Sequence, residues 1–181
     1  MYTKTTSTWR IAPVCFCVLL LFNSIYHSSA QGTWTPLTNA APNRNYGVML
    51  LLPDGSVLVK TDTDSHGFDC SCPANPGDTW NKLIPDSLGS YANGTWTTIA
   101  HMADTRIYFA SQVMPDGRVY VVGGEYSSGQ TKAEIYNPLT DTWIAVSDPT
   151  VDTILDGNSQ LLPDGRILQA VAINPDNRTL I

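Results

Sequence analysis

The chain has 181 residues, of which 43% are hydrophobic and 14% are charged. Sixteen acidic and ten basic residues give it a formal net charge of −6 at neutral pH, and the basic residues are scattered. This composition argues against nucleic acid or an anionic membrane as a partner, because both attract clustered positive charge.

The first thirty residues are predicted to be a secretory signal peptide. Lys4 and Arg10 precede an unbroken apolar run, 11–22, and a polar stretch then ends in small residues just before Gln31. The run has twelve residues, whereas a membrane-spanning helix needs roughly 17 to 25, so we expect a removed signal and no membrane anchor. The mature chain would be secreted, to the extracellular space, the periplasm or the cell surface. Its net charge would be −8, because the leader carries two basic residues and no acidic ones.

Two short markers recur along the mature chain and keep step with each other. The first is a Thr-Trp pair, which contains Trp34, Trp96 and Trp143. The second is a Pro-Asp-Gly turn, which begins at residues 53, 115 and 163. Both markers advance by 62 residues from the first copy to the second, and by 47 or 48 from the second to the third. Such a repeat predicts three units of one structural type, roughly 31–96, 97–145 and 146–181.

The first unit is about fourteen residues longer than the second, and the excess lies in 61–78. This stretch is polar, rich in turn formers and without periodicity, which predicts an inserted surface loop. It holds Cys70 and Cys72, the two cysteines of the mature chain. They could form a strained disulfide across one serine or pair with another chain, and the spacing leaves both alternatives open. No second ligand pair at zinc-site spacing accompanies them, so no metal site is predicted.

Apolar runs flank each Pro-Asp-Gly turn, which predicts a β-hairpin in every unit. In the middle unit the hairpin strands are 108–114 and 118–122, and two more short runs follow at 133–136 and 142–145. No amphipathic helical window of useful length occurs outside the leader, so the expected class is all-β. Four antiparallel strands repeated every 47 to 62 residues are typical of the blades of a β-propeller.

The middle unit resembles the kelch repeat. An apolar run leads into Gly123 and Gly124, and Tyr136 is followed by Trp143 seven residues later. In such a blade the glycines let the strand bend at its end, and the two aromatic rings supply apolar surface between neighbouring sheets. The string 79–96 further resembles secreted, galactose-oxidase-like kelch proteins. The resemblance implies a kelch-type β-propeller.

The outer units depart from the kelch pattern, because they carry Lys60-Thr61 and Gln169-Ala170 near the place of the double glycine. Their Trp and Pro-Asp-Gly markers alone assign them. We therefore expect about three four-stranded blades, an incomplete propeller, since closed rings have about four to eight blades. Two explanations of the incomplete propeller are open. The sequence is a truncated part of a longer protein, or its open edge associates with another chain to complete the ring.

The chemistry of the family does not transfer to this chain residue by residue. The resemblance implies a copper ion held by two tyrosines and two histidines, as in galactose oxidase. The mature chain has two histidines, His66 and His101, and neither has a tyrosine beside it. The sequence also lacks a nucleophile elbow, a phosphate-binding glycine loop and a zinc-protease motif. We predict no catalytic residue, no metal site and no cofactor.

Polar residues at the predicted blade rims are the candidate ligand contacts. Glu125 and Tyr126 follow the double glycine, and Asp104 and Arg106 precede an inner strand. Rim loops of a rigid scaffold often carry binding residues, and these side chains could hydrogen-bond a sugar or a peptide. One hypothesis is a non-catalytic extracellular module that binds a glycan or a protein. The other is the N-terminal part of a carbohydrate-active enzyme, a copper oxidase or a sugar isomerase or lyase, whose site residues lie downstream.

Two Asn-x-Thr strings, at Asn93 and Asn177, match the acceptor pattern for N-glycosylation. The first, Asn93-Gly94-Thr95, suits an Asn-Gly turn between strands equally well.

Overall fold

The computed structural model describes residues 32–43, 46–61, 77–148, 153–172 and 178–181. The predicted signal peptide, Cys70, Cys72, His66 and Asn177 lie outside the described residues. The chain divides into two compact units, Met1–Trp34 and Thr35–Ile181, and the second holds every described strand. Within the described ranges there is no helix that is long and apolar enough to cross a membrane.

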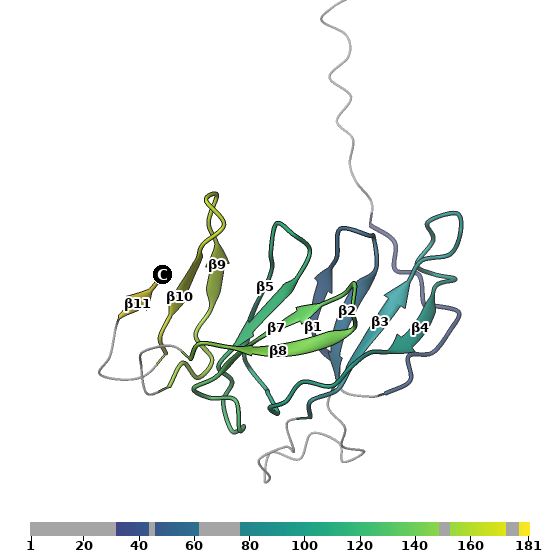
Figure 1. Ribbon diagram of the computed structural model, residues 1–181. Coiled ribbons are helices and arrows are strands. Elements are labelled where there is room, and N and C mark those ends of the chain that lie inside the picture. The colour runs from purple at the N-terminus through teal and green to yellow at the C-terminus, as the bar shows by residue number, and fades with distance from the viewer. Residues whose placement is uncertain (1–31, 44–45, 62–76, 149–152, 173–177) are drawn as a thin grey trace, which may run out of the picture. The chain divides into compact units, whose positions relative to one another are not determined.

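The described strands form three antiparallel sheets in which neighbouring strands follow chain order (Figure 1). Blade 1 consists of β1 (Tyr46–Leu51), β2 (Val57–Thr61), β3 (Trp80–Ile84) and β4 (Thr95–Thr98). Blade 2 consists of β5 (Ala110–Val113), β6 (Val119–Val122), β7 (Ala133–Asn137) and β8 (Thr142–Val146). Blade 3 consists of β9 (Ser159–Leu161), β10 (Ile167–Ala170) and β11 (Thr179–Leu180). The prediction of an all-β chain built from propeller blades is confirmed.

The Pro-Asp-Gly turns have the same geometry in all three blades. In blade 1 the Gly55 N–H donates to the Leu52 carbonyl at 2.9 Å, and the Leu52 N–H donates to the Ser56 carbonyl at 2.8 Å. The aspartate side chain accepts the backbone N–H two residues later, as Asp54 does from Ser56 at 2.9 Å. The glycine has φ between 82° and 85° in every copy, a left-handed conformation that glycine adopts without steric cost. The repeated tripeptide therefore encodes the hairpin locally.

The first strand of each blade contacts the first strand of the next, β1 with β5 and β5 with β9. A single apolar cluster joins blade 1 to blade 2. Its buried members are Leu52, Leu58, Trp80, Ile99, Met102, Phe109, Val119, Val121 and Tyr136. Trp143 packs against this cluster, with its ring centroid 5.7 Å from Trp80 and 5.0 Å from Tyr136. Its indole N–H donates to the Ala100 carbonyl at 2.8 Å. Large aromatic surfaces thus fill the space between two sheets, as expected for stacked blades.

A second cluster joins blade 2 to blade 3. It consists of Ala110, Val122 and Ala133 from blade 2 with Ile154 and Val171 from the third unit. The Gln112 side chain reinforces it by donating to the Ser159 carbonyl at 2.7 Å. Its members are smaller than those of the first cluster, so this interface buries less aromatic surface.

Three sequence expectations need correction. Trp34 belongs to no strand and its side chain is fully exposed, so it does not pack as the marker in blade 2 does. Thr61, placed at the start of the inserted loop 61–78, is the last residue of β2 and is buried. Counted from the Pro-Asp-Gly turn, the first glycine of the pair in blade 2 corresponds to Thr61 in blade 1 and to Val171 in the third unit, one and two residues after Lys60 and Gln169.

Candidate functional site

Arg106 was expected at a solvent-exposed rim, but its side chain is completely buried. Its guanidinium donates to the backbone carbonyls of Gly123, Gly129 and Lys132, at 2.7, 2.8 and 2.9 Å. It also donates to Glu134 at 3.0 Å, forming an ion pair whose partners are 0% and 2% exposed. Arg106 therefore cannot touch a ligand directly. It holds both ends of the loop between β6 and β7.

Glu134 completes this buried junction. Its carboxylate accepts the backbone N–H groups of Ala103 and Asp104, at 2.8 and 3.3 Å, in addition to Arg106. A buried carboxylate with a charged partner and backbone donors has its desolvation offset. The segment 103–106 is thereby fixed against β7.

The double glycine ends β6 and brings the chain against the next blade. Gly123 and Gly124 have φ of 74° and 121°, and the Gly124 N–H donates to the Leu155 carbonyl at 2.8 Å. A Cβ atom on Gly123 would lie 2.7 Å from the Leu155 carbonyl oxygen. Both the conformation and the close approach require glycine at residue 123. This contact joins the β6–β7 loop to the third unit.

Three residues with strained backbones meet at this junction. Tyr108, Tyr126 and Leu155 have φ of 54°, 52° and 53°, and they are three of the four non-glycine residues with positive φ in the described ranges. The Glu125 N–H donates to the Ile107 carbonyl at 2.9 Å, which places the segments of Tyr108 and Tyr126 beside each other. Strain of this kind costs about 1–3 kcal/mol per residue and is concentrated at functional sites.

The two tyrosines of this junction are exposed, and acidic groups lie beside them. Tyr108 is 49% exposed and Tyr126 is 59% exposed. The pKa of Tyr126 is raised, first because its hydroxyl hydrogen-bonds the Glu125 carboxylate and then because the charges of Glu125 and Asp156 oppose a phenolate. We call Tyr108, Glu125, Tyr126 and Asp156 the tyrosine site. Its aromatic faces can pack on a ligand while its hydroxyls and carboxylates exchange hydrogen bonds.

Asp104, the remaining rim candidate, is largely buried and fully engaged at the edge of this site. Its Oδ1 accepts Lys132 Nζ at 2.8 Å and Ser128 Oγ at 3.0 Å. The ion pair raises the pKa of Lys132. Asp104 therefore anchors the β6–β7 loop through two of its side chains. Of the four rim candidates, only Glu125 and Tyr126 have accessible side chains.

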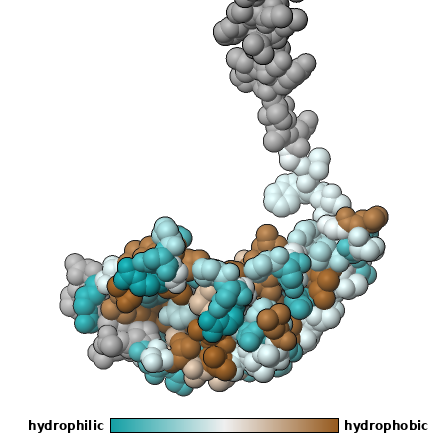
Figure 2. Space-filling model, turned by 45° about the horizontal axis from the view of Figure 1, so that its top comes forward, coloured by the Kyte–Doolittle hydropathy of each residue, from teal (hydrophilic) through white to brown (hydrophobic). Residues whose placement is uncertain are grey.

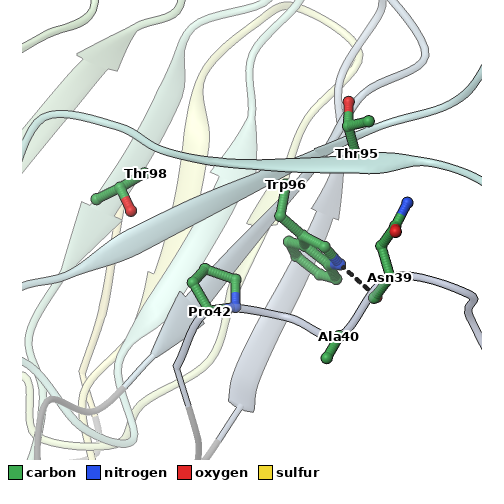
Figure 3. Close-up of a pocket in the computed structure, with 6 residues that line it drawn as sticks. All are labelled: Asn39, Ala40, Pro42, Thr95, Trp96 and Thr98. Carbon is green, nitrogen blue, oxygen red and sulfur yellow. Dashed lines mark hydrogen bonds between the residues drawn. The ribbon is translucent and has the colours of Figure 1, made fainter.

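A shallow pocket of about 390 Å³ lies on the outer strand of blade 1. Figure 3 shows the Trp96 ring over the segment that carries Asn39 and Pro42, and its indole N–H donates to the Asn39 carbonyl at 3.2 Å. Trp143 makes the same kind of bond to Ala100 in blade 2. The pocket therefore arises where a connecting segment crosses a blade, and no strained or titratable group singles it out as a ligand site.

One face of blade 1 forms an apolar groove in which Val59 and Leu83 are buried, whereas Met49 and Leu51 are exposed. Leu51, Val57, Val59, Leu83 and Trp96 line a groove of about 580 Å³ there, and we call them the open face. Leu51 is 63% exposed and Met49 beside it is 62% exposed. Figure 2 shows hydrophobic residues reaching the surface between polar ones on the side in view. Large exposed apolar patches commonly mark interaction sites.

The described ranges contain no group of three or more His, Cys, Asp or Glu residues able to hold a metal ion. His101 is exposed and its Nδ1 lies 2.9 Å from Asp78 Oδ1. The described donors therefore do not form the two-histidine, two-tyrosine set implied by the resemblance, and no step through copper can be derived from them.

Sequence reasoning placed Glu125 and Tyr126 at a rim but missed Tyr108 and Asp156. Tyr108 was assigned to a regular strand, whereas β5 begins at Ala110 and Tyr108 turns out of the sheet with positive φ. Asp156 belongs to the next unit, so only the packing of blade 3 brings it near. The signal that could have found Tyr108 is its place two residues after Arg106, in the connection entering the blade.

Comparisons with known proteins agree with this architecture. Residues 108–150 match the family model described as the Kelch motif. A galactose oxidase of Gibberella zeae is 32% identical over 82 residues, which are 44% of this chain and 12% of that protein. An F-box/kelch-repeat protein of Arabidopsis thaliana is 35% identical over 74 residues, which are 39% of this chain and 20% of that protein.

A solved structure shows the same fold. It is a fungal alcohol oxidase of the AA5 family in complex with copper, with a TM-score of 0.51 and 19% sequence identity. The match covers 65% of this chain and 24% of the oxidase. The chain thus spans only about an eighth to a quarter of the length of these relatives.

Proposed function

Since the chain carries a Kelch motif and is built from the blades of a galactose-oxidase-like kelch propeller, we propose that it is an exported binding module whose tyrosine site takes a glycan. Export is supported by the charged, apolar and small-residue pattern of residues 1–30. We propose a non-catalytic role, which the aromatic and acidic binding groups of the tyrosine site support.

The observation that carries the proposal is the exposure of two strained tyrosines on a fixed backbone. Arg106 binds three carbonyls of the β6–β7 loop, so Tyr126 is presented by a loop whose ends cannot move freely. A pre-organised loop loses little entropy on binding. Tyrosine adds contact area at low conformational cost.

The chemistry of the site favours a neutral sugar over an anionic ligand. Glu125 and Asp156 repel anions, whereas their oxygens accept hydrogen bonds from sugar hydroxyls. The name of the galactose oxidase relative gives independent support for a sugar, although the similarity covers a small part of that protein. A protein ligand, bound through the same tyrosines, is the alternative outcome of the test.

The test titrates the chain with neutral mono- and oligosaccharides while the tyrosine resonances or fluorescence are recorded. We expect saturable changes that Tyr126→Ala weakens at least tenfold, because it removes one of the two aromatic faces. Leu139→Ala is the matched control: Leu139 is 92% exposed in the β7–β8 turn and should leave binding unchanged. Absence of sugar binding by the folded chain, or equal weakening by both variants, would refute a glycan site here.

The alternative function is part of a carbohydrate-active enzyme, and similarity to a copper-containing oxidase fold is what favours it. The test is hydrogen peroxide release from galactose after the full chain is incubated with Cu²⁺. We expect no release, because the described residues lack the ligand cluster. Peroxide formation that depends on Tyr108 would establish the oxidase function and displace the binding role.

Self-association through the open face is a further part of the proposal. In the strand register Val57, Leu83 and Trp96 take the positions that Val119, Tyr136 and Trp143 take in blade 2. The blade 2 residues are covered by blade 1, so the open face has the pattern of a surface built to receive another blade. We commit to a blade of a second copy as its occupant.

Light scattering across a concentration series tests this association. We expect a dimer that Leu51→Glu dissociates, because the new charge would be buried at the contact, whereas Leu139→Glu leaves the mass unchanged. A monomer at every concentration would exclude the second copy as the occupant.

A further inference from the structure

The turn between β3 and β4 contains Asn93-Gly94-Thr95, and the side chains of Asn93 and Thr95 are both exposed. We propose that Asn93 carries an N-linked glycan. Such a modification is bulky and needs a surface position together with the Asn-x-Thr pattern. The inference goes beyond the binding role and depends only on export of the chain, which the experiment below examines separately.

Gly94 is required by packing and Thr95 belongs to the recurring Thr-Trp marker, so Asn93 is the residue that completes the acceptor pattern. A Cβ atom on Gly94 would lie 2.7 Å from the Ile84 carbonyl oxygen and 2.8 Å from Leu83 Cδ1, so packing requires glycine there. The Thr95 hydroxyl, in contrast, makes no hydrogen bond within the described residues and is exposed at the first position of β4. Threonine at this place satisfies the acceptor pattern.

The atom that would bond the sugar, Asn93 Nδ2, makes only one long contact among the described residues. Asn93 Oδ1 accepts the Thr38 hydroxyl at 3.1 Å, which orients the amide. Asn93 Nδ2 makes one long contact, 3.4 Å to Asp86 Oδ2. An amide has two N–H groups, so replacing one with a glycosidic bond leaves the other for Asp86.

The turn keeps its shape without that long contact. Asp86 Oδ1 accepts the backbone N–H groups of Leu88 and Ser90 at 2.9 and 2.8 Å, and the Gly94 N–H donates to the Tyr91 carbonyl at 3.0 Å. The Thr38 N–H donates to the Ala92 carbonyl at 2.7 Å from the crossing segment. A glycan can therefore be attached without rearranging the fold.

The glycan would lie at the end of the blade opposite to the tyrosine site. Antiparallel strands place the β3–β4 turn at the Pro-Asp-Gly end of the blade, where Tyr91 Oη donates to the Gly55 carbonyl at 2.7 Å. The β6–β7 loop, with Tyr126, lies at the opposite end of its blade.

The experiment secretes the full chain from eukaryotic cells, once with residues 1–30 and once with a proven leader in their place. Peptide N-glycosidase treatment in ¹⁸O-labelled water followed by peptide mass spectrometry then reads residue 93, because the enzyme converts glycosylated asparagine to labelled aspartate, whereas spontaneous deamidation of Asn-Gly before the treatment leaves no label. We expect labelled aspartate at residue 93 in most of the secreted protein. The peptide-level readout keeps Asn93 apart from Asn177.

Three variants separate the modification from folding. Asn93→Gln and Thr95→Val should each remove one enzyme-sensitive gel shift, whereas Thr95→Ser keeps the acceptor pattern and should retain it. Unmodified asparagine at residue 93 in chain secreted behind the proven leader would overturn the proposal. If the chain is secreted behind the proven leader but not behind residues 1–30, the signal peptide is refuted. The protein secreted behind the proven leader still shows whether Asn93 is glycosylated.

Discussion

Blades 1 and 2 present the same register positions to very different surroundings. Val119 and Tyr136 in blade 2 are buried in a cluster that includes Trp80 of blade 1. Their counterparts Val57 and Leu83 line a groove beside the exposed side chains of Met49 and Leu51, although Leu83 itself is buried. Blade 2 has apolar residues on this face because they pack against blade 1. Blade 1 has apolar residues at the same positions, although no sheet in the described structure packs against them.

The blades also differ at the third strand, where Glu134 and Asn81 occupy equivalent positions. Glu134 pairs with the buried Arg106, whereas Asn81 makes neutral hydrogen bonds to Thr98 and Thr61, at 3.0 and 3.4 Å. Blade 2 therefore has a charged pair at the position where blade 1 has the neutral Asn81. Substitutions at matched positions can measure this difference.

Loss of the charged junction should have the largest effect. Arg106→Met would leave Glu134 buried without its cation and three carbonyls without a donor, so we expect the free energy of unfolding to fall by about 3–5 kcal/mol. Arg118→Met removes an exposed arginine that pairs with Asp116 and should change it by about 0.5 kcal/mol or less. Chemical denaturation measures both. Equal losses of unfolding free energy would mean that the buried ion pair stabilises blade 2 no more than an exposed one does.

The double glycine gives the next largest effect. Gly123→Ala combines a positive φ with a clash against Leu155, so we expect a loss of about 2–3 kcal/mol. Gly165→Ala, in the open hairpin turn of blade 3, keeps the positive φ without any neighbour within 4 Å and should cost about 1 kcal/mol. If thermal unfolding finds the two equal, the close approach of β6 to the third unit is absent in solution.

Matched valines sharpen the comparison of the faces. Val119→Ala removes two methyl groups from a closed cluster and should cost about 2 kcal/mol. Val57→Ala makes the same change on the open face and should cost about half as much, because the site is already partly hydrated. The denaturant midpoints of the wild type and the two variants, measured at low protein concentration, give both costs. A cost at residue 57 that rises with protein concentration would show that a second copy covers the open face.

The smallest effect is expected at the Tyr136 hydroxyl, which donates to Asp141 at 2.9 Å. Tyr136→Phe should cost about 1 kcal/mol near neutral pH. Burial first, and the Asp141 hydrogen bond second, raise the pKa of Tyr136 above its ordinary value of 10.0. The folded state therefore retains this proton better than the unfolded state, so the stabilisation is complete below pH 10 and is lost above it. Unfolding measured from pH 8 to 11 should show the wild type losing its advantage over the variant. A constant difference would contradict this.

Local features of the fold were predictable from the sequence, and long-range ones were not. Pro-Asp-Gly specifies its hairpin within five residues, so every copy could be found without knowledge of the rest of the chain. Arg106 has the composition of a surface residue, but its acceptors lie 17 to 26 residues further along the chain. Nothing in the local sequence shows that these carbonyls converge.

The candidate site was half predictable for the same reason. Glu125 and Tyr126 follow a recognisable strand end, which places them at a rim. Tyr108 adopts a positive φ that its residue type disfavours, and only the bridge between Ile107 and Glu125 shows that its segment lies beside Tyr126. Trp34 shows the converse error, since a marker residue without a paired strand has no sheet to pack on.

The bonds made by Arg106 have a consequence for how such a loop can diversify. All three of its loop acceptors are main-chain carbonyls, which every amino acid possesses. The side chains of Glu125 and Tyr126 can therefore be exchanged without altering this anchoring, provided that Ser128 keeps its bond to Asp104 and Gly129 remains to admit the guanidinium. The loop backbone is held in place whatever side chains its tip carries. Substitutions at the tip could therefore change ligand preference in related chains while stability stays nearly constant.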